Sequence, residues 1–275
     1  FKVEYEGLEN FDTSPYFIPQ YEAVSFASRQ PGILLSGWYA QSSPSAPVVI
    51  LTHGIGTGKL ASNVLLPAGM LYRNGFNVLL FDLRNHGQSG VDNGRTSIGN
   101  KEYLDVLGAW DYVVKERGVD PARVGLFGVS LGAGSTLNAF AAEPLIAAAL
   151  VDSPFADLQQ IVAEELARTG YPTLLAPAGI FTARVFAGVD LLAHTPQDAI
   201  RQDAGRPIFI IHGLDDERIN VRHSRQLEEL AQQSGANVQV WYVPGAGHVK
   251  SEFVQPEEYE QKIVTFYIAA LGVTN

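Results

Sequence analysis

Short, continuously apolar runs alternate with amphipathic segments along most of the chain. Two early runs, at 22–29 and 33–39, flank Gln30-Pro31-Gly32 and predict a β-hairpin. Strands that are apolar throughout and separated by helices imply a mostly parallel sheet covered by helices on both faces. The pattern predicts such strands at 48–52, 77–81, 123–127, 147–151, 207–211 and 238–243, and helices at 62–74, 100–117, 133–139, 223–233 and 257–271.

Five of these strands run into polar or glycine-containing turns. Reactive groups of a parallel α/β sheet gather at the carboxyl ends of its strands, so these turns are the first place to look for chemistry. A serine, then an acid, then a histidine each come just after a strand. The five turns are Thr52-His53-Gly54-Ile55-Gly56, Asp82 to Gly90, the segment at Ser130, His212-Gly213-Leu214-Asp215-Asp216 and Pro244-Gly245-Ala246-Gly247-His248.

The most informative turn is Gly128-Val129-Ser130-Leu131-Gly132, which reads G-x-S-x-G. A predicted strand precedes it and a small, helix-compatible segment follows it. Strand, sharp turn and helix are the setting in which a nucleophilic serine is held above the sheet. The two glycines leave room for such a turn, because a Cβ there would collide with the neighbouring strand or helix. We predict that Ser130 is a nucleophile.

A serine hydroxyl needs a base, and the base needs a carboxylate that fixes its tautomer. His248 is the predicted base, because it follows the last strand in a glycine-rich loop. The residues alone leave three acids open: Asp215, Asp216 and Asp152, the last of which could instead cap the helix after Pro154. The remaining histidines are assigned structural turns (His53, His212), a hydrogen-bonding loop (His86) or no distinctive setting (His194, His223).

The oxyanion that forms during attack on a carbonyl needs backbone N–H groups aimed at it. We expect one from Leu131, directly after the nucleophile, and one from Ile55 in the loop after the first parallel strand. That loop also contains Gly58-Lys59, which raises the alternative of a phosphate loop. Gly54 to Lys59 is one residue short of the required spacing, and Ala61 stands where Ser or Thr is needed, so nucleotide binding is not expected.

The five turns in this order resemble the α/β-hydrolase superfamily over nearly the whole chain. The chain looks most like the small-lid branch that holds bacterial serine esterases, prolyl-type peptidase domains and membrane-anchored hydrolases. The resemblance implies the α/β-hydrolase fold and a triad of Ser130, Asp216 and His248. In that family the acid turn reads H-G-x-x-D followed by an aliphatic residue three positions on, and Asp216 with Ile219 fits this frame where Asp215 does not. Asn220, at a position often held by proline, is a small departure.

Residues from about 155 to 200 are too many for a simple crossover, and we expect a helical lid over Ser130. Its apolar residues either line an acyl pocket or pack the lid onto the core. Asp157, Glu164 and Glu165 are expected on a solvated helix face. The apolar positions are Leu174, Leu175, Ile180, Phe181, Val185, Phe186, Leu191 and Leu192, with Pro172, Pro177, Gly179 and Gly188 as helix breakers.

The composition of the chain limits its domain organisation, its partners and the chemistry open to it. The 275 residues suit one α/β-hydrolase domain, 1–275, of which 46% are hydrophobic. A formal net charge of −10 argues against a nucleic-acid partner, and the lack of cysteine excludes disulfides, thiolate metal sites and a cysteine nucleophile. No apolar stretch is long enough to span a membrane. The first residue is Phe1, so we expect a processed N-terminus, which leaves a signal or membrane anchor and the compartment open.

The leading hypothesis is a cofactor-independent serine carboxylesterase, without a metal, acting as a monomer or dimer on a small uncharged ester of short to medium acyl chain. A peptidase or amidase of the same fold is the alternative enzyme. A catalytically silent module that binds a ligand in the same cleft is the alternative of another class, which the intact set of Ser130, His248 and Asp216 disfavours.

Overall fold

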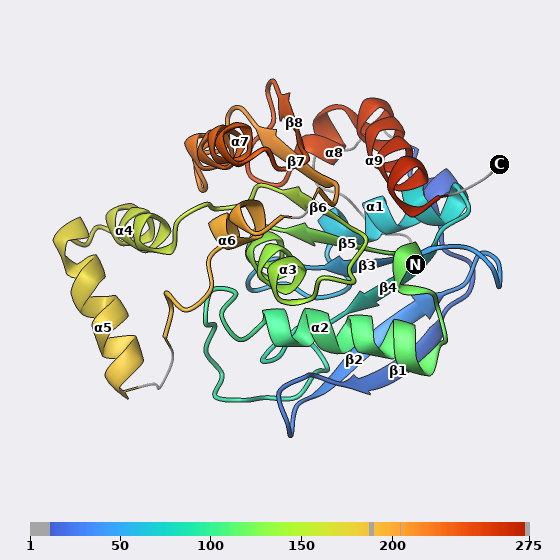
Figure 1. The fold of residues 1–275 in the computed structure, drawn as a ribbon, viewed down its shortest axis with the longest axis horizontal. Helices are drawn as coiled ribbons and strands as arrows, with labels where there is room; N and C mark the ends of the chain where they lie inside the picture. Colours follow the sequence, from blue (N-terminus) through green and yellow to red (C-terminus); the bar gives the residue numbers. More distant parts are fainter. Residues whose placement is uncertain (1–11, 187–189, 204, 273–275) are drawn as a thin grey trace.

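The computed structural model describes residues 12–186, 190–203 and 205–272. Its centre is an eight-stranded sheet in the order β1-β2-β4-β3-β5-β6-β7-β8 (Figure 1). The first two strands form an antiparallel hairpin, β2 pairs antiparallel with β4, and all later pairs are parallel. The strands are β1 (Glu22–Ala27), β2 (Leu34–Ala40), β3 (Val48–Thr52), β4 (Asn77–Phe81), β5 (Val124–Val129), β6 (Ala148–Asp152), β7 (Ile208–Gly213) and β8 (Val238–Val243).

The predicted hairpin, the mostly parallel sheet and the fold class are confirmed. Strands β3 to β7 are buried at every position, which is why their sequences read as continuous apolar runs rather than alternating ones. The two hairpin strands differ from these, because buried positions in β1 and β2 alternate with exposed or half-buried ones over part of each strand.

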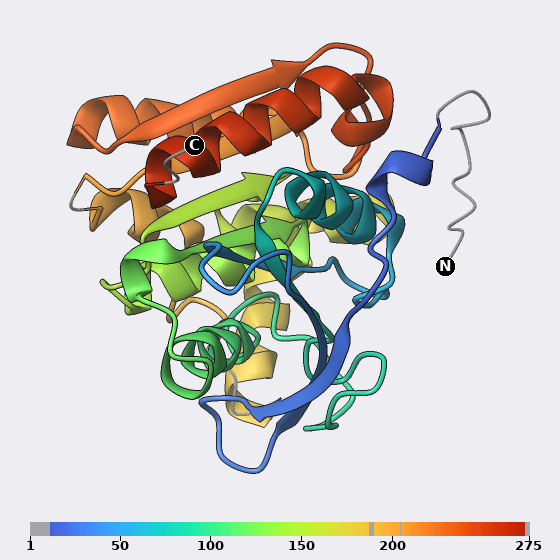
Figure 2. The ribbon, with the colours of Figure 1, turned by 90° about the vertical axis from the view of Figure 1, so that its right-hand side faces the viewer.

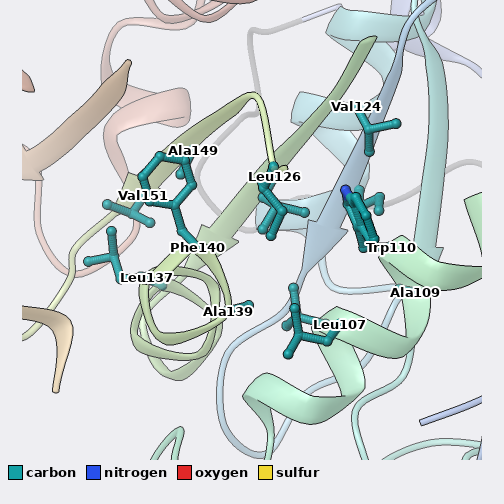
Figure 3. Close-up of a cluster of buried hydrophobic side chains, with 14 of the residues drawn as sticks. Leu107, Ala109, Trp110, Val124, Leu126, Leu137, Ala139, Phe140, Ala149 and Val151 are labelled. Carbon is teal, nitrogen blue, oxygen red and sulfur yellow. The ribbon is translucent and has the colours of Figure 1, made fainter. Parts of the chain in front are cut away.

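Helices cover both faces of the sheet (Figures 1 and 2). One face carries α2 (Tyr103–Asp111), α3 (Leu131–Ala142), α6 (Pro196–Arg201) and α7 (Arg222–Ser234), and the other carries α1 (Ser62–Arg73) and α9 (Pro256–Leu271). Figure 3 shows part of the first of these faces, where Phe140 and Leu137 of α3 lie beside Ala149 and Val151 of β6, and Trp110 of α2 lies beside Val124 and Leu126 of β5. Fully burying side chains of this size contributes roughly 1.5–3 kcal/mol each, so this packing fixes α2 and α3 against the sheet.

The helix predicted at 100–117 begins three residues later and changes form near its end. Glu102 accepts hydrogen bonds from the backbone N–H groups of Ser97 (2.8 Å) and Gly99 (2.9 Å), so the chain from 97 to 102 turns before the helix starts. After α2 the chain makes a π-helical turn at Tyr112–Glu116. The spacing of apolar residues therefore predicted the helix, but not the turn that precedes it or the residue at which it begins.

Between β6 and β7 the chain leaves the sheet. It forms α4 (Leu158–Arg168), a 3₁₀ turn (Thr173–Leu175) and α5 (Ala176–Phe186), and then returns through α6. In Figure 1, α4 and α5 lie to one side of the sheet, and α5 lies outermost. Gly188, one of the predicted helix breakers, lies outside the described residues. The role of this segment as a lid stays a prediction.

Within the part of the chain that the structure describes, no helix combines the length and the apolar character that a membrane span requires.

Candidate active site

Ser130 occupies a sharp turn between β5 and α3. Its backbone has φ 54° and ψ −117°, a left-handed conformation that non-glycine residues rarely adopt. The two flanking glycines make the turn sterically feasible. A Cβ on Gly128 would lie 2.3 Å from the Gly132 carbonyl oxygen, and one on Gly132 would lie 2.3 Å from the Thr52 carbonyl oxygen. Glycine is therefore required at both positions, and the strain is concentrated at the serine itself.

His248 lies in the turn after β8, and its ring reaches both partners that the sequence suggested. Its Nε2 is 3.0 Å from Ser130 Oγ, and its Nδ1 is 2.8 Å from Asp216 Oδ2. A carboxylate only accepts hydrogen bonds, so Nδ1 carries the proton and the Nε2 lone pair faces the serine hydroxyl. This is the arrangement in which a histidine can take a proton from serine.

Asp216, rather than Asp215 or Asp152, is the carboxylate bonded to His248. Its side chain is fully buried, and its Oδ1 accepts the backbone N–H groups of Arg218 (2.9 Å) and Ile219 (2.8 Å). Burial alone would raise the pKa of Asp216. The hydrogen bonds from His212 and His248 and from the Ile219 N–H outweigh burial and hold this pKa well below its usual range. The carboxylate therefore stays ionised and can fix the His248 tautomer.

The other two acids lie elsewhere. Asp215 is exposed to solvent. Asp152 is fully buried behind the site, where Ser153 and Tyr259 donate hydrogen bonds to it. The alternative role of Asp152 as a helix cap is wrong, because the cap of α4 is Asp157, whose side chain accepts the Gln160 N–H at 2.8 Å.

The two backbone segments expected to form an oxyanion hole flank Ser130. Leu131 is the first residue of α3, where N–H groups have no acceptor within the helix. The loop after β3 passes close to the serine, since a Cβ on Gly54 would lie 3.4 Å from the Ser130 Cβ. Ile55, the next residue, lines the same pocket as Ser130 and Leu131. Their role as donors to an oxyanion stays a prediction.

Two histidines hold the loop after β3 in place. His53 donates from Nδ1 to the Gly54 carbonyl oxygen (2.7 Å), while its Nε2 accepts the Leu83 N–H (3.0 Å). Burial lowers the pKa of His53 to about 4, so the ring is neutral at physiological pH. His86 accepts the Gly56 N–H at its Nε2 (3.2 Å). Both histidines therefore have the structural roles that their positions suggested.

Lys59, the residue that raised the phosphate-loop alternative, is buried in an ion pair. Its Nζ lies 2.5 Å from Asp82 Oδ2, and its backbone N–H donates to Asp82 Oδ1 at 2.8 Å. The lysine thereby ties the loop after β3 to the loop after β4. It is directed into the protein and away from any anion that could approach the loop.

A cavity of about 330 Å³ opens at Ser130, near the lower end of the range for ligand pockets. Its walls are mostly apolar, and polar side chains lie among them at Thr96, Glu165, Thr169 and Arg218. Besides Ile55 and Leu131, the apolar wall contains Ile98 from the turn before α2, Phe155, Ile161, Val162 and Leu166 from α4 and the segment before it, and Ile219 from the turn after β7.

The apolar residues singled out in the lid do not line this cavity. The cavity wall comes from α4, one helix earlier than the residues that the sequence highlighted. Both interpretations of the lid residues, pocket lining and core packing, are wrong for Leu174, Phe181 and Phe186, whose surfaces are 77%, 65% and 83% exposed. Among the positions named, Ile180 and Leu191 are buried and join a small cluster with Phe155 and Ile161.

The glutamates of α4 are also not a simply solvated face. Glu164 forms an ion pair with Arg222 and lies 3.2 Å from His223 Nε2. His223 is fully buried and accepts the Ala156 N–H at its Nδ1 (3.2 Å). This histidine, for which the sequence indicated no distinctive setting, therefore ties α4 and the segment before it to α7. Glu165 lies at the cavity with Arg218, 3.6 Å from its Nε.

Solved structures of known enzymes share this fold. The esterase Pf2001 of Pyrococcus furiosus superposes with a TM-score of 0.74 at 25% identity, covering 95% of this chain and 97% of that one. Est1E from Butyrivibrio proteoclasticus, solved with ferulic acid bound, gives a TM-score of 0.69 at 18% identity over 91% of this chain and 100% of that one. The acylaminoacyl peptidase of Pyrococcus horikoshii gives 0.65 at 17% identity, over 90% of this chain but 41% of the peptidase.

Relatives in sequence cover most of the chain as well. The uncharacterised protein Rv2307c of Mycobacterium tuberculosis is 30% identical over 227 residues, which are 82% of this chain and 72% of that protein. Human ABHD12B is 26% identical over 236 residues, 77% of this chain and 58% of that one. The model of the prolyl oligopeptidase family matches residues 67–274, which include Ser130, Asp216 and His248. The chain thus belongs to the prolyl oligopeptidase family and has the α/β-hydrolase fold of its serine hydrolases.

Proposed function

We propose that this protein is a serine carboxylesterase that cleaves uncharged esters of short to medium acyl chains through an acyl-enzyme on Ser130. The observation that carries the proposal is the position of Ser130 Oγ. It lies 3.0 Å from His248 Nε2 and at the edge of a cavity with mostly apolar walls. An uncharged acyl group can enter such a cavity, whereas an ionised one would lose its hydration there.

The reaction begins when Ser130 Oγ attacks the ester carbonyl carbon while its proton passes to His248 Nε2. Asp216 keeps the imidazolium oriented and offsets its charge. The negative charge that develops on the carbonyl oxygen is stabilised by the backbone N–H groups of Leu131 and Ile55. The bond to the alcohol oxygen then breaks, and His248 returns the proton to the departing alkoxide.

Hydrolysis of the acyl-enzyme repeats these steps with water. His248 Nε2 takes a proton from water as its oxygen attacks the acyl carbon. The bond to Ser130 Oγ then breaks, the serine recovers its proton, and the carboxylic acid leaves. The proposed cycle uses only side chains and backbone of this chain and requires no cofactor.

Hydrolysis of peptides or amides is the second candidate. Membership of the prolyl oligopeptidase family favours it, as does the pair of Glu165 and Arg218 beside the otherwise apolar cavity. Such charged groups could recognise a terminus of a short peptide.

Turnover of p-nitrophenyl esters, from acetate to dodecanoate, tests the proposal against aminoacyl and N-acyl-aminoacyl p-nitroanilides. We expect ester hydrolysis that peaks at a short or medium chain and is abolished in Ser130→Ala. Anilide hydrolysis that exceeds ester hydrolysis, and is equally lost in Ser130→Ala, assigns the protein to the peptidase class. A folded wild type that is inactive on both series and does not react with a fluorophosphonate supports a silent binding module.

A further inference from the structure

The junction of β6 with the following loop contacts the segments that carry all three proposed catalytic residues. The Asp152 carbonyl oxygen accepts the backbone N–H of Ser130 at 3.0 Å. The Ser153 N–H donates to the carbonyl oxygen of Ile211 at 2.9 Å, in the strand that leads to Asp216. Strand β6 lies between β5 and β7, so Asp152 and Ser153 occupy the middle of the site's supporting layer.

The side chain of Ser153 extends this support to the histidine. Its Oγ accepts the backbone N–H of Val249, the residue directly after His248, at 3.2 Å. Val249 has φ 48° and Ser153 has φ 52°. A positive φ is rare for any non-glycine residue and a clear outlier for a β-branched one. Strained backbone of this kind persists only where surrounding contacts hold it, and the Ser153 hydroxyl provides such a contact.

The carboxylate of Asp152 sets the direction of that hydroxyl. Ser153 Oγ lies 3.0 Å from Asp152 Oδ1, and Tyr259 donates its hydroxyl to Asp152 Oδ2 at 3.3 Å. Burial raises the pKa of Asp152 to about 6, against the lowering effect of the hydrogen bond from Ser153. Both carboxyl oxygens of Asp152 accept hydrogen bonds, so the Ser153 proton is directed at Oδ1 and a lone pair of Ser153 Oγ remains for the Val249 N–H.

We propose that Ser153 is a positioning residue for catalysis, whose hydroxyl, oriented by Asp152, holds Val249 and thereby keeps His248 aligned with Ser130 and Asp216. The inference rests on the proposed function, because alignment matters only if His248 acts as a base. A small displacement of a catalytic group can cost up to about 100-fold in rate. Substrate binding in the cavity is unaffected, since neither Ser153 nor Val249 lines it.

The chain offers a matched control for the test. Ser251 is also fully buried, lies two residues after Val249, and has a hydroxyl with no hydrogen-bond partner among the described residues. Ser153→Ala and Ser251→Ala therefore each remove one hydroxyl oxygen from a fully buried position. They differ because the Ser153 hydroxyl is bonded to Val249, next to His248, whereas the Ser251 hydroxyl has no such bond among the described residues.

The experiment measures kcat and KM on the best p-nitrophenyl ester, together with the rate of fluorophosphonate labelling, for both variants. We expect Ser153→Ala to lose about 10- to 100-fold in kcat and in labelling rate with KM within about twofold, and Ser251→Ala to keep both rates within about twofold. Ser153→Gly removes the same hydroxyl while tolerating the positive φ, so it repeats the test if the alanine variant does not fold.

Equal rates in the Ser153 and Ser251 variants overturn the inference, as does a loss in Ser153→Ala that is confined to melting temperature or to KM. Both results leave the proposed function intact, because the wild type still turns over ester. A wild type that neither hydrolyses ester nor labels at Ser130 overturns the proposed function, and the inference falls with it.

Discussion

The Nδ1 of His248 lies 2.8 Å from Oδ2 of Asp216, although 32 residues and the whole of α7 and β8 separate the two along the chain. The contact exists because β7 and β8 are adjacent and parallel, so the turns after them meet at one edge of the sheet. It also distinguishes Asp216 from its neighbour Asp215, which is exposed.

Asp216→Asn therefore leaves the fold in place but removes the acceptor that fixes the His248 tautomer. We expect kcat/KM on p-nitrophenyl esters to fall by about 1,000- to 10,000-fold. Asp215→Asn is the matched control and should stay within about twofold of wild type. A comparable loss in both variants, or none in Asp216→Asn, contradicts the assignment of the acid.

The apolar cavity predicts a change in chain-length preference when it is filled. Val162 of α4 lines the cavity, whereas Val185 of α5 is 55% exposed. Val162→Phe should lower kcat/KM for the longest accepted acyl chain by at least about tenfold while acetate changes little, because the added ring occupies space needed by the acyl tail. Val185→Phe should leave the profile unchanged. If the two variants share one profile, the acyl group binds elsewhere.

A side chain at position 132 should destabilise the fold, because the backbone around Gly132 leaves no room for a Cβ. The Cβ of Gly132→Ala would lie 2.3 Å from the Thr52 carbonyl oxygen and 2.5 Å from that of His53, and backbone cannot yield cheaply. We expect a loss of about 1–3 kcal/mol or more in the free energy of unfolding, measured by urea denaturation. Gly179→Ala, in α5 with open space around it, should gain up to about 1 kcal/mol. The prediction fails if Gly132→Ala is as stable as wild type.

The buried carboxyl of Glu252 should make the stability of the fold depend on pH. Its carboxyl is fully buried and has no hydrogen-bond partner among the described residues. Burial, reinforced by the charge of Asp152, raises the pKa of Glu252 well above its ordinary value of 4.5. The folded state thus keeps a proton that the unfolded state loses, so stability falls as pH rises above about 4.5, by up to about 1.4 kcal/mol per pH unit for one proton.

Glu252→Met should remove this fall and raise the free energy of unfolding at pH 8 more than at pH 5, because an apolar side chain of similar length incurs no charge burial. The exposed Glu257, to which the same substitution can be made, provides the control, and its variant should keep the wild-type pH slope. Unfolding curves at several pH values measure this. Equal effects of Glu252→Met at pH 5 and pH 8 contradict the role given to its burial.

Sequence predicted much of the fold because local patterns report strand burial directly. Because Ser130, Asp216 and His248 each follow a parallel strand, their place at one edge of the sheet could be predicted without knowing how the side chains pack. The acid was less certain, since Asp152, Asp215 and Asp216 all lie at or just after strand ends, and only the tertiary structure shows which of the three carboxylates is hydrogen-bonded to His248. The residue frame of the resembled family was needed to prefer Asp216.

The surroundings of the site could not be predicted for a related reason. Apolar residues such as Phe181 and Phe186 suggested a pocket wall, yet the helix that carries them lies away from the core and the wall comes from α4. The burial of Glu252 and His223 also left no local signal, because charged and polar side chains are buried by the tertiary contacts of the elements around them. The positive φ angles of Ser153 and Val249, and the hydrogen bond that joins these two residues, likewise leave no signal in the sequence.

Every step of the proposed reaction depends on Ser130 as the nucleophile. The most direct measurement is to label the wild-type protein with a fluorophosphonate and locate the adduct by peptide mass spectrometry. We predict one adduct per chain, on Ser130, with labelling lost in Ser130→Ala and strongly slowed in Asp216→Asn. An adduct on a different residue, or no adduct on folded protein, would contradict it.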